Sequence, residues 1–378
     1  MKANLTRSRN RKTIKRSGIV VLKTIKIIAT VALTIYLISC FYAQDEHWRD
    51  IKTIGADKSS GTIGTDYLFN KFKFINTKTG FFLGLYKDEN KIGDYTRVNI
   101  NKNQDAIILR TLDGGYNWQE NILGKGEIID FNKVSNALLA LRKSYNGRDA
   151  KDIISHLHIS KDQGATWEEV SQNKEKPIDE IHFWTSQKGI GICGLIEKGS
   201  KFKILYTEDT GKNWREIELS KMYEGMDFAV TSKGVLYYLT KERNSYVKAD
   251  FSAMESEEIK FTNMDFTPFS VVLDNNDKVY FVVKDKDKRN ILYKKMEGNS
   301  LKKIDFPFKN QMIYDVQIYD NTIAILADDK CYYRSDDQGA TWSKEQIGAS
   351  YISMVAFYGK EHVWMRTFPE QMILRTPL

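Results

Sequence analysis

The stretch SKDQGATW, residues 160–167, is one of four in this chain that share the pattern Ser/Thr-x-Asp-x-Gly-x-Thr/Asn-Trp. The other three are TLDGGYNW at 111–118, TEDTGKNW at 207–214 and SDDQGATW at 335–342. Each follows a short apolar run that is typical of a β-strand, such as residues 204–206. A motif that recurs in this way indicates a repeat architecture, and this feature decides the fold.

Each stretch predicts a hairpin turn. Asp and Ser/Thr side chains can bond nearby backbone N–H groups, and glycine adopts a positive φ angle at no steric cost. The tryptophan then returns to the sheet as a large anchor. The predicted turn residues are Asp113, Gly115 and Trp118, Asp162, Gly164 and Trp167, Asp209, Gly211 and Trp214, and Asp337, Gly339 and Trp342.

The pattern resembles the Asp-box, or BNR, repeat of sialidases, sortilin-type receptors and photosystem II assembly factor-like proteins. In that family the boxes lie on the rim of a β-propeller, away from the binding face. The resemblance therefore implies an all-β propeller whose box aspartates form turns and are neither catalysts nor calcium ligands.

The spacing of the boxes predicts further, degenerate units. The box aspartates are separated by 49, 47 and 128 residues, and the last interval is too long for one blade of about 40–50 residues. Residues 293–304 align without gaps on residues 206–217, with Met296 in the Asp place, Gly298 as the turn glycine and Leu301 in place of the Trp. A weaker unit lies near residues 246–250.

Pairs of apolar strands joined by a turn support the same count. Residues 72–75 with 80–84 and 181–184 with 189–194 are examples, and others begin near Met226, Val271, Val316 and Met354. The C-terminal residues 373–376 resemble a third strand, and residues 48–51 resemble a fourth. Because closure removes exposed sheet edges, we predict seven four-stranded blades closed by the N-terminal strand, with six or eight as alternatives.

Residues 1–40 predict a membrane address. They hold nine basic residues and no acidic one, and residues 27–38 form an apolar stretch. The stretch ends in Leu37-Ile38-Ser39-Cys40, which resembles a bacterial lipobox, and that resemblance implies acylation of Cys40. The alternative is an uncleaved anchor with its basic tail inside the cytoplasm. Both interpretations place the propeller, residues 41–378, outside the cytoplasm in the cell envelope.

The charge of the chain belongs to this address. The net charge is +8, but without the nine basic residues of the first 40 there remain 48 basic and 49 acidic residues. We therefore expect no nucleic-acid partner, because phosphate binding needs a cationic surface on the folded domain. Cys193 and Cys331 could pair, but burial as free thiols is the favoured prediction. No Cys or His spacing indicates a metal, and we expect no cofactor.

The sequence carries no recognisable catalytic motif, so the favoured interpretation is that the chain is not an enzyme. None of the five histidines lies in a known motif, and no GxSxG, P-loop or dinucleotide fingerprint occurs. Sialidases carry a Phe-Arg-Ile-Pro-like motif and three arginines, whereas Phe-Arg-x-Pro is absent here. Arg110, Arg334 and Arg375 precede boxes or their equivalents, so we interpret them as repeat features. A sialidase-like or other carbohydrate-active glycosidase is the alternative function.

The favoured function is binding of another protein. The boxes mark the connection between strands three and four, so the loops between strands two and three open on the opposite face. Long loops on a rigid scaffold commonly carry binding residues, and Tyr and Arg are enriched at interfaces. The predicted binding residues are Tyr95, Arg97, Arg142, Tyr145, Arg148 and Arg243.

The sequence thus leaves two classes of function open. The first is a monomeric, membrane-tethered propeller that serves as an assembly factor for an envelope complex or as an immunity protein against a secreted toxin. The second is the glycosidase. Carboxylates and arginines clustered at the central channel mouth would favour the second, and a flat polar loop face without perturbed carboxylates would favour the first.

Overall fold

The computed structural model describes residues 48–51, 67–86, 104–146, 152–194, 203–219, 227–262, 265–309, 311–328, 331–346, 351–359, 362–368 and 371–375. The chain divides into two units, Met1–Arg49 with Leu378, and Asp50–Pro377. The second unit contains the propeller. The proposed acylation site Cys40 and the apolar stretch 27–38 lie outside the described residues. Within the described part of the chain, no helix combines the length and apolar character needed to cross a membrane.

Six blades are built from continuous chain, each with four consecutive antiparallel strands, so the predicted four-stranded β-propeller blades are confirmed. The blades are β2 (Tyr67–Phe74), β3 (Gly80–Tyr86), β4 (Asp105–Thr111) and β5 (Gln119–Lys125), then β6 (Glu127–Val134), β7 (Ala137–Tyr145), β8 (Ile153–Ser160) and β9 (Glu168–Asn173), then β10 (Glu180–Phe183), β11 (Gly189–Cys193), β12 (Lys203–Thr207) and β13 (Arg215–Ile217), then β14 (Phe228–Val230), β15 (Val235–Leu239), β16 (Ser245–Asp250) and β17 (Glu255–Lys260), then β18 (Phe266–Leu273), β19 (Val279–Asp285), β20 (Asn290–Lys295) and β21 (Leu301–Asp305), and then β22 (Ile313–Tyr319), β23 (Thr322–Ala327), β24 (Cys331–Ser335) and β25 (Ser343–Gln346).

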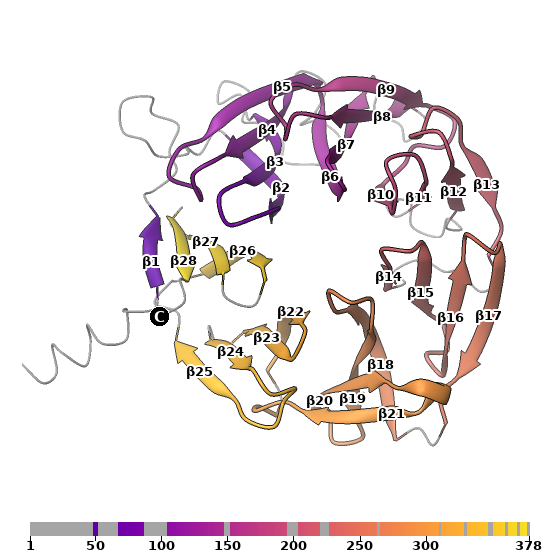
Figure 1. Ribbon diagram of the computed structural model, residues 1–378, viewed down its shortest axis with the longest axis vertical. Helices are drawn as coiled ribbons and strands as arrows, with labels where there is room; N and C mark the ends of the chain where they lie inside the picture. The colour runs from indigo at the N-terminus through magenta and orange to yellow at the C-terminus, as the bar shows by residue number, and fades with distance from the viewer. Residues whose placement is uncertain are drawn as a thin grey trace, which may run out of the picture. The chain divides into compact units, whose positions relative to one another are not determined.

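One further sheet is composite, with the strand order β1-β28-β27-β26. Its strands are β1 (Trp48–Ile51), β26 (Tyr351–Tyr358), β27 (His362–Phe368) and β28 (Gln371–Arg375). The sequence similarity between the two ends of the chain predicts this pairing. Figure 1 shows the sheets of the second unit around a common centre, with β2, β6, β10, β14, β18 and β22 innermost and β5, β9, β13, β17, β21 and β25 outermost.

The degenerate units predicted in the long gap between boxes are also confirmed as blades. Strands β20 and β21 span the unit predicted at 293–304, and a short 3-10 turn, Glu297–Asn299, joins them with Gly298 at φ 65°. Strand β16 spans the weaker unit near residues 246–250. Its end keeps a trace of the box, because the Asp250 carboxylate accepts the backbone N–H groups of Ser252 and Ala253.

The core lies between blades because the second strands are apolar on both faces. Every residue of β11 and of β23 is buried, whereas the outer strand β17 is almost entirely exposed. Each apolar cluster joins two neighbouring blades. One cluster, for example, contains Phe81 and Leu83 of β3 together with Phe131 of β6 and Leu138 of β7. This arrangement explains why the outer strands can be polar while the blades still pack tightly.

The four boxes share one hydrogen-bond geometry. In each box the Ser or Thr hydroxyl accepts the glycine N–H at 2.7–2.9 Å. The aspartate Oδ1 accepts the N–H of the residue four positions later at 2.8–2.9 Å. Its Oδ2 accepts that residue's side chain at 2.6–2.7 Å. Each box carboxylate is therefore occupied within its own turn.

Candidate functional site

The antiparallel blades give the propeller two distinct faces. Connections between strands one and two, and between three and four, leave on the side that carries the boxes, which we call the box face. Connections between strands two and three, and from strand four to the next blade, leave on the opposite side, which we call the loop face. The sequence analysis placed the binding site on the loop face.

Three of the six predicted binding residues, Tyr95, Arg97 and Arg148, lie outside the described residues. Tyr145 is half-buried at the end of β7, and its hydroxyl donates a hydrogen bond to the Glu127 carboxylate.

Arg142 corrects the prediction of an exposed loop residue. It lies inside β7, which stays paired with β8 as far as Tyr145, and it is only 7% exposed. Its guanidinium donates to the Lys125 carbonyl at 2.6 Å, to Glu169 Oε2 at 3.1 Å and to His158 Nε2 at 3.2 Å. Arg142 therefore serves the interior of its blade and is not available to a partner.

Arg243 is the predicted residue that the structure places in a cavity. It is half-buried in the turn between β15 and β16, at φ 55°, and its backbone N–H donates to the Thr240 carbonyl at 2.9 Å. This turn directs Arg243 toward the beginnings of β18 and β22. There it helps to line a cavity of about 350 Å³ on the loop face. The cavity is lined by Arg243, Thr267, Phe269, Lys284, Asn290, Gln311, Met312, Ile313 and Asp328.

The edge of this loop-face cavity is apolar and exposed. Met312 is 57% exposed, and the adjacent Tyr314 is 51% exposed. Phe269 lies where the register of β18 shifts, between Pro268 and Ser270, and the Lys284 ammonium is 5.9 Å from the centre of its ring. Large apolar side chains gathered at a rigid cavity are typical of a surface that contacts another molecule.

The floor of the cavity holds a polar atom with unused capacity. Asn290 is 4% exposed, and its Nδ2 donates to the Gln311 carbonyl at 2.6 Å. This bond fixes which atom of the amide is nitrogen. No described protein donor reaches the buried Oδ1. A buried carbonyl oxygen of this kind gains stability when an N–H or O–H donor enters the site.

Two carboxyl groups on or next to the inner strands have raised pKa values, Asp227 just before β14 and Asp315 on β22. Burial raises the pKa of Asp227, although the Val271 amide and the nearby Arg243 act in the opposite direction. Burial likewise raises the pKa of Asp315 on β22. Within the described ranges, the innermost strands contain no arginine, and no group of three His, Cys, Asp or Glu residues could hold a metal. The arginine that acts on Asp227 is Arg243, which comes from the turn between β15 and β16 and not from an inner strand.

The arginines weighed as a sialidase triad lie on third strands. Arg110 is on β4 and Arg334 is on β24, where it pairs with Asp336 at 2.8 Å. Arg375 is on β28. These positions are equivalent from blade to blade. Cys193 and Cys331 form no disulfide bond and are both buried, as the sequence favoured.

Most residues of the loop-face cavity were missed by the sequence analysis. Long loops were the basis of the predicted site, whereas Phe269, Met312 and Ile313 lie at or just before the beginnings of inner strands. The available signal was Gln311-Met312-Ile313-Tyr314, where apolar residues occupy consecutive positions ahead of an alternating strand. Asn290 could not be distinguished from an ordinary turn residue.

Comparisons with known proteins support the resemblance to Asp-box propellers. The family model described as "Sortilin, neurotensin receptor 3" matches residues 155–309, and the BNR/Asp-box repeat model matches residues 333–344. A comparison with curated protein sequences found no match. The predicted resemblance to BNR propellers is therefore confirmed on these segments.

Solved structures resemble the whole propeller. YCF48 bound to a D1 peptide has a TM-score of 0.60 and 13% identity, covering 88% of this chain and 96% of that chain. YCF48 from Cyanidioschyzon merolae has a TM-score of 0.57 and 14% identity, covering 88% and 99%. Virginiamycin B lyase from Staphylococcus aureus has a TM-score of 0.56 and 11% identity, covering 88% and 99%. At these identities the likeness shows the fold alone.

Proposed function

We propose that this chain is a protein-binding propeller whose loop-face cavity receives a short peptide segment of a partner protein. The observation that carries the proposal is the coincidence, in one cavity, of exposed apolar side chains, two cations and the unpartnered Asn290 oxygen. A propeller of the same fold, YCF48, has been solved with a D1 peptide, which supports peptide binding as a use of this scaffold.

The apolar edge would supply most of the affinity. Met312 is more than half exposed beside Phe269 and Ile313, so an inserted apolar side chain would remove all three from water. Methionine adapts its shape readily and is frequent on surfaces that receive peptide side chains. We therefore expect the partner segment to carry at least one large apolar residue.

The polar groups of the cavity would decide which residues can stand beside the apolar anchor in the partner segment. Arg243 and Lys284 place two positive charges around the cavity, against the single negative charge of Asp328. Asn290 Oδ1 is closed to solvent in this structure and would accept a backbone N–H from the segment once its side chain turns toward the cavity. These groups favour a segment with an acidic residue next to its apolar anchor, because charge complementarity fixes orientation and excludes wrong partners.

The cellular setting is part of the proposal. We propose that residues 1–40 tether the chain to a membrane, with Cys40 acylated and the propeller outside the cytoplasm. The composite sheet would act as the seventh blade and close a monomeric ring. In that setting the chain would be an assembly factor for an envelope complex or an immunity protein. Incorporation of labelled fatty acid into wild type, and its absence from Cys40→Ser, would support acylation.

The binding site is tested with a displayed random-peptide library selected on the full chain in detergent. The test variant is Met312→Asp, and the matched control is Met254→Asp on the box face, where Met254 is 46% exposed. We expect wild type and control to select peptides with a large apolar residue beside Asp or Glu. We expect Met312→Asp to bind those peptides at least about tenfold more weakly.

Selection of the same peptides with equal affinity by Met312→Asp would contradict the proposal. So would a selected set that responds only to a combined Tyr95, Arg97, Tyr145 and Arg148 alanine variant, since that result would favour the loops of the first two blades. Release of sugar from glycan substrates by the purified chain would favour the glycosidase alternative.

A further inference from the structure

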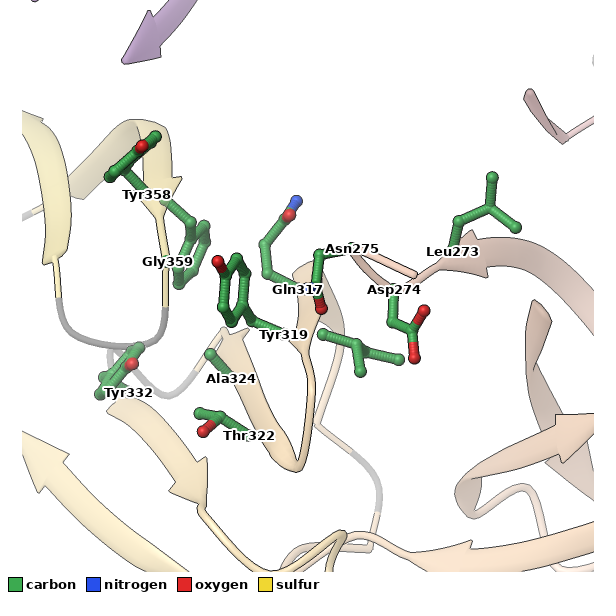
Figure 2. Close-up of a pocket in the computed structure, with 12 residues that line it drawn as sticks. Leu273, Asp274, Asn275, Gln317, Tyr319, Thr322, Ala324, Tyr332, Tyr358 and Gly359 are labelled. Atoms are coloured by element: carbon green, nitrogen blue, oxygen red, sulfur yellow. The ribbon is translucent and has the colours of Figure 1, made fainter. Parts of the chain in front are cut away.

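A second cavity lies on the box face, separate from the loop-face cavity. Its volume is about 340 Å³, and it opens between blade β18–β21, blade β22–β25 and the turn after β26 (Figure 2). It is lined by Leu273, Asp274, Asn275, Gln317, Ile318, Tyr319, Thr322, Ala324, Tyr332, Phe357, Tyr358 and Gly359. Nothing in the proposed peptide binding uses these residues.

Four aromatic rings form one side of this box-face cavity. Tyr319 and Tyr358 are each 39% exposed, and Figure 2 shows their rings at the cavity with Tyr332 beneath them. Tyr332 and Phe357 stack with their ring centres 6.5 Å apart. Aromatic faces carry a negative quadrupole, so rings around a common space attract a positive charge placed between them.

Negative charge lies near the opposite side, although Figure 2 shows the Asp274 carboxylate directed away from the rings. Asp274 lines the cavity and is 5% exposed, and Asp320 lies in the adjoining turn. None of the described residues that line the cavity is a lysine, an arginine or a histidine. Lys278 and Lys294 lie outside the lining, and the Lys294 ammonium, which interacts electrostatically with Asp274, is 5.5 Å from the ring centre of Tyr280.

The walls of the cavity are held in place before any ligand arrives. Asp274 and Ile318 form a bridge between the two blades. Across the same junction, the Asp320 N–H donates to Asn275 Oδ1 at 2.7 Å, and Asn275 Nδ2 donates to Asp320 Oδ1 at 3.2 Å. A cavity with fixed walls loses little conformational freedom when a ligand binds.

We propose that the box-face cavity binds a quaternary ammonium group. The rings and the buried carboxylate together favour a cation. The hydrogen-bond pattern then decides its type, because Asp274 already accepts the N–H groups of Asn276 and Lys278 at 2.8 and 2.9 Å and the Tyr280 hydroxyl at 3.5 Å. Asn275 Oδ1 is also occupied.

A primary ammonium or a guanidinium would lose water from its N–H donors, and the Asp274 and Asn275 oxygens that could replace it already accept other N–H groups. A quaternary ammonium has no N–H donor. It gains the electrostatic attraction of the rings and of Asp274 without losing hydrogen bonds to water. Its methyl groups would make apolar contacts with Leu273 and Ile318.

The test is isothermal titration of the full chain in a maltoside detergent with choline chloride, at an ionic strength fixed with sodium chloride. The neutral isostere 3,3-dimethylbutan-1-ol and methylammonium chloride are titrated in parallel. We expect choline to bind, with the neutral alcohol and methylammonium each at least about tenfold weaker. Equal binding of the neutral alcohol, tighter binding of methylammonium, or no saturable heat from choline would each overturn the proposal.

Variants separate the rings from general stability. Tyr319→Leu and Tyr358→Leu remove a ring but keep apolar bulk, and each should weaken choline binding about tenfold, whereas Tyr319→Phe should retain it. The matched control is Tyr116→Leu, because Tyr116 is 53% exposed in the turn of the first box. Equal loss in the control, or no loss in either Leu variant, would contradict the site.

A final arm distinguishes a soluble ligand from a lipid headgroup. The chain is sedimented with phosphatidylcholine vesicles and with phosphatidylglycerol vesicles, each with and without free choline. If the chain sediments with phosphatidylcholine vesicles and free choline releases it, the result supports the site and identifies a lipid headgroup as the ligand. Choline binding in titration without such retention supports the site with a small solute as the source.

Discussion

Lys143 on β7 and Asp179, just before β10, form an ion pair that joins two neighbouring blades in an almost dry environment. Their side chains are 1% and 6% exposed. The second Asp179 oxygen accepts the Gly194 N–H at 2.7 Å, so the carboxylate is fully engaged. A buried pair of this kind contributes to the free energy of unfolding mainly because each charge compensates the burial of the other.

Removing one member of this pair should be far more harmful than removing both. We expect Lys143→Met alone to lower the free energy of unfolding by about 3–5 kcal/mol, since it leaves the Asp179 charge buried without its partner. The double variant Lys143→Met with Asp179→Leu should recover most of that loss. Denaturant unfolding of the three proteins checks this, and equal stability of the single and double variants would contradict it.

Two buried histidines should make stability depend on pH. Burial, together with the adjacent Arg142, lowers the pKa of His158 to about 4 and lowers the pKa of His156. Unfolding restores an ordinary pKa near 6.5, so the unfolded chain binds more protons between about pH 6.5 and pH 4. Stability is therefore complete above this window and is lost as the pH falls through it.

The size of this effect follows from the pKa of His158. Its contribution to the free energy of unfolding should fall by about 2 kcal/mol between pH 7 and pH 5. His158→Gln should remove that part of the pH dependence while other titrations continue. Unfolding free energies at the two pH values measure the difference, and an unchanged slope in the variant would exclude His158 as its source.

The box glycines should be sensitive for two separable reasons. Gly211 has φ 79°, and a Cβ there would lie 2.4 Å from a Leu157 methyl of the preceding blade. Gly298 has φ 65°, but its Cβ would meet nothing within 4 Å. We expect Gly211→Ala to be less stable than Gly298→Ala by about 1–3 kcal/mol, because only the first also overpacks the core. Equal thermal shifts would show that backbone strain alone matters.

The cysteines should be inert in the folded chain. Burial raises the pKa of the Cys193 thiol to about 12, and Cys331 is 1% exposed. Because the thiolate is the reactive form, a Cys40→Ser chain should give no reaction with a thiol-specific dye at pH 8. The same protein in guanidinium should give two reactive thiols. Rapid labelling of the native protein would contradict the packing described here.

The fold was largely predictable because its signals are local. The spacing of Asp, Gly and Trp within each box, such as Asp162, Gly164 and Trp167, is enough to predict a turn there. The neighbouring strands are apolar enough to be identified as strands. The unit at residues 293–304 was recognisable although it lacks the Asp and Trp, because Gly298 keeps the turn and the flanking strands keep their pattern.

The sites were less predictable because they depend on positions brought together from several blades. Arg142 was expected in a loop, since Arg142-Lys143-Ser144-Tyr145 is polar, but pairing with β8 draws these residues into a strand whose charges are neutralised by Glu169 and Asp179. Arg243 was chosen because it lies between strands two and three, and the structure places it beside the loop-face cavity. The aromatic residues of the box-face cavity come from two sheets, the blade β22–β25 and the composite sheet, and no local pattern links them.

The composite sheet has a consequence for the order of events during synthesis. Strand β1 is made before the six blades, whereas its neighbours β26, β27 and β28 are made after them. Six blades can form as their residues emerge, but β1 cannot pair with β28 until all six have been made. An incomplete chain, halted by truncation or delayed release, would therefore present two unpaired strand edges at once, and these are the surfaces at which a chaperone or a second copy would attach.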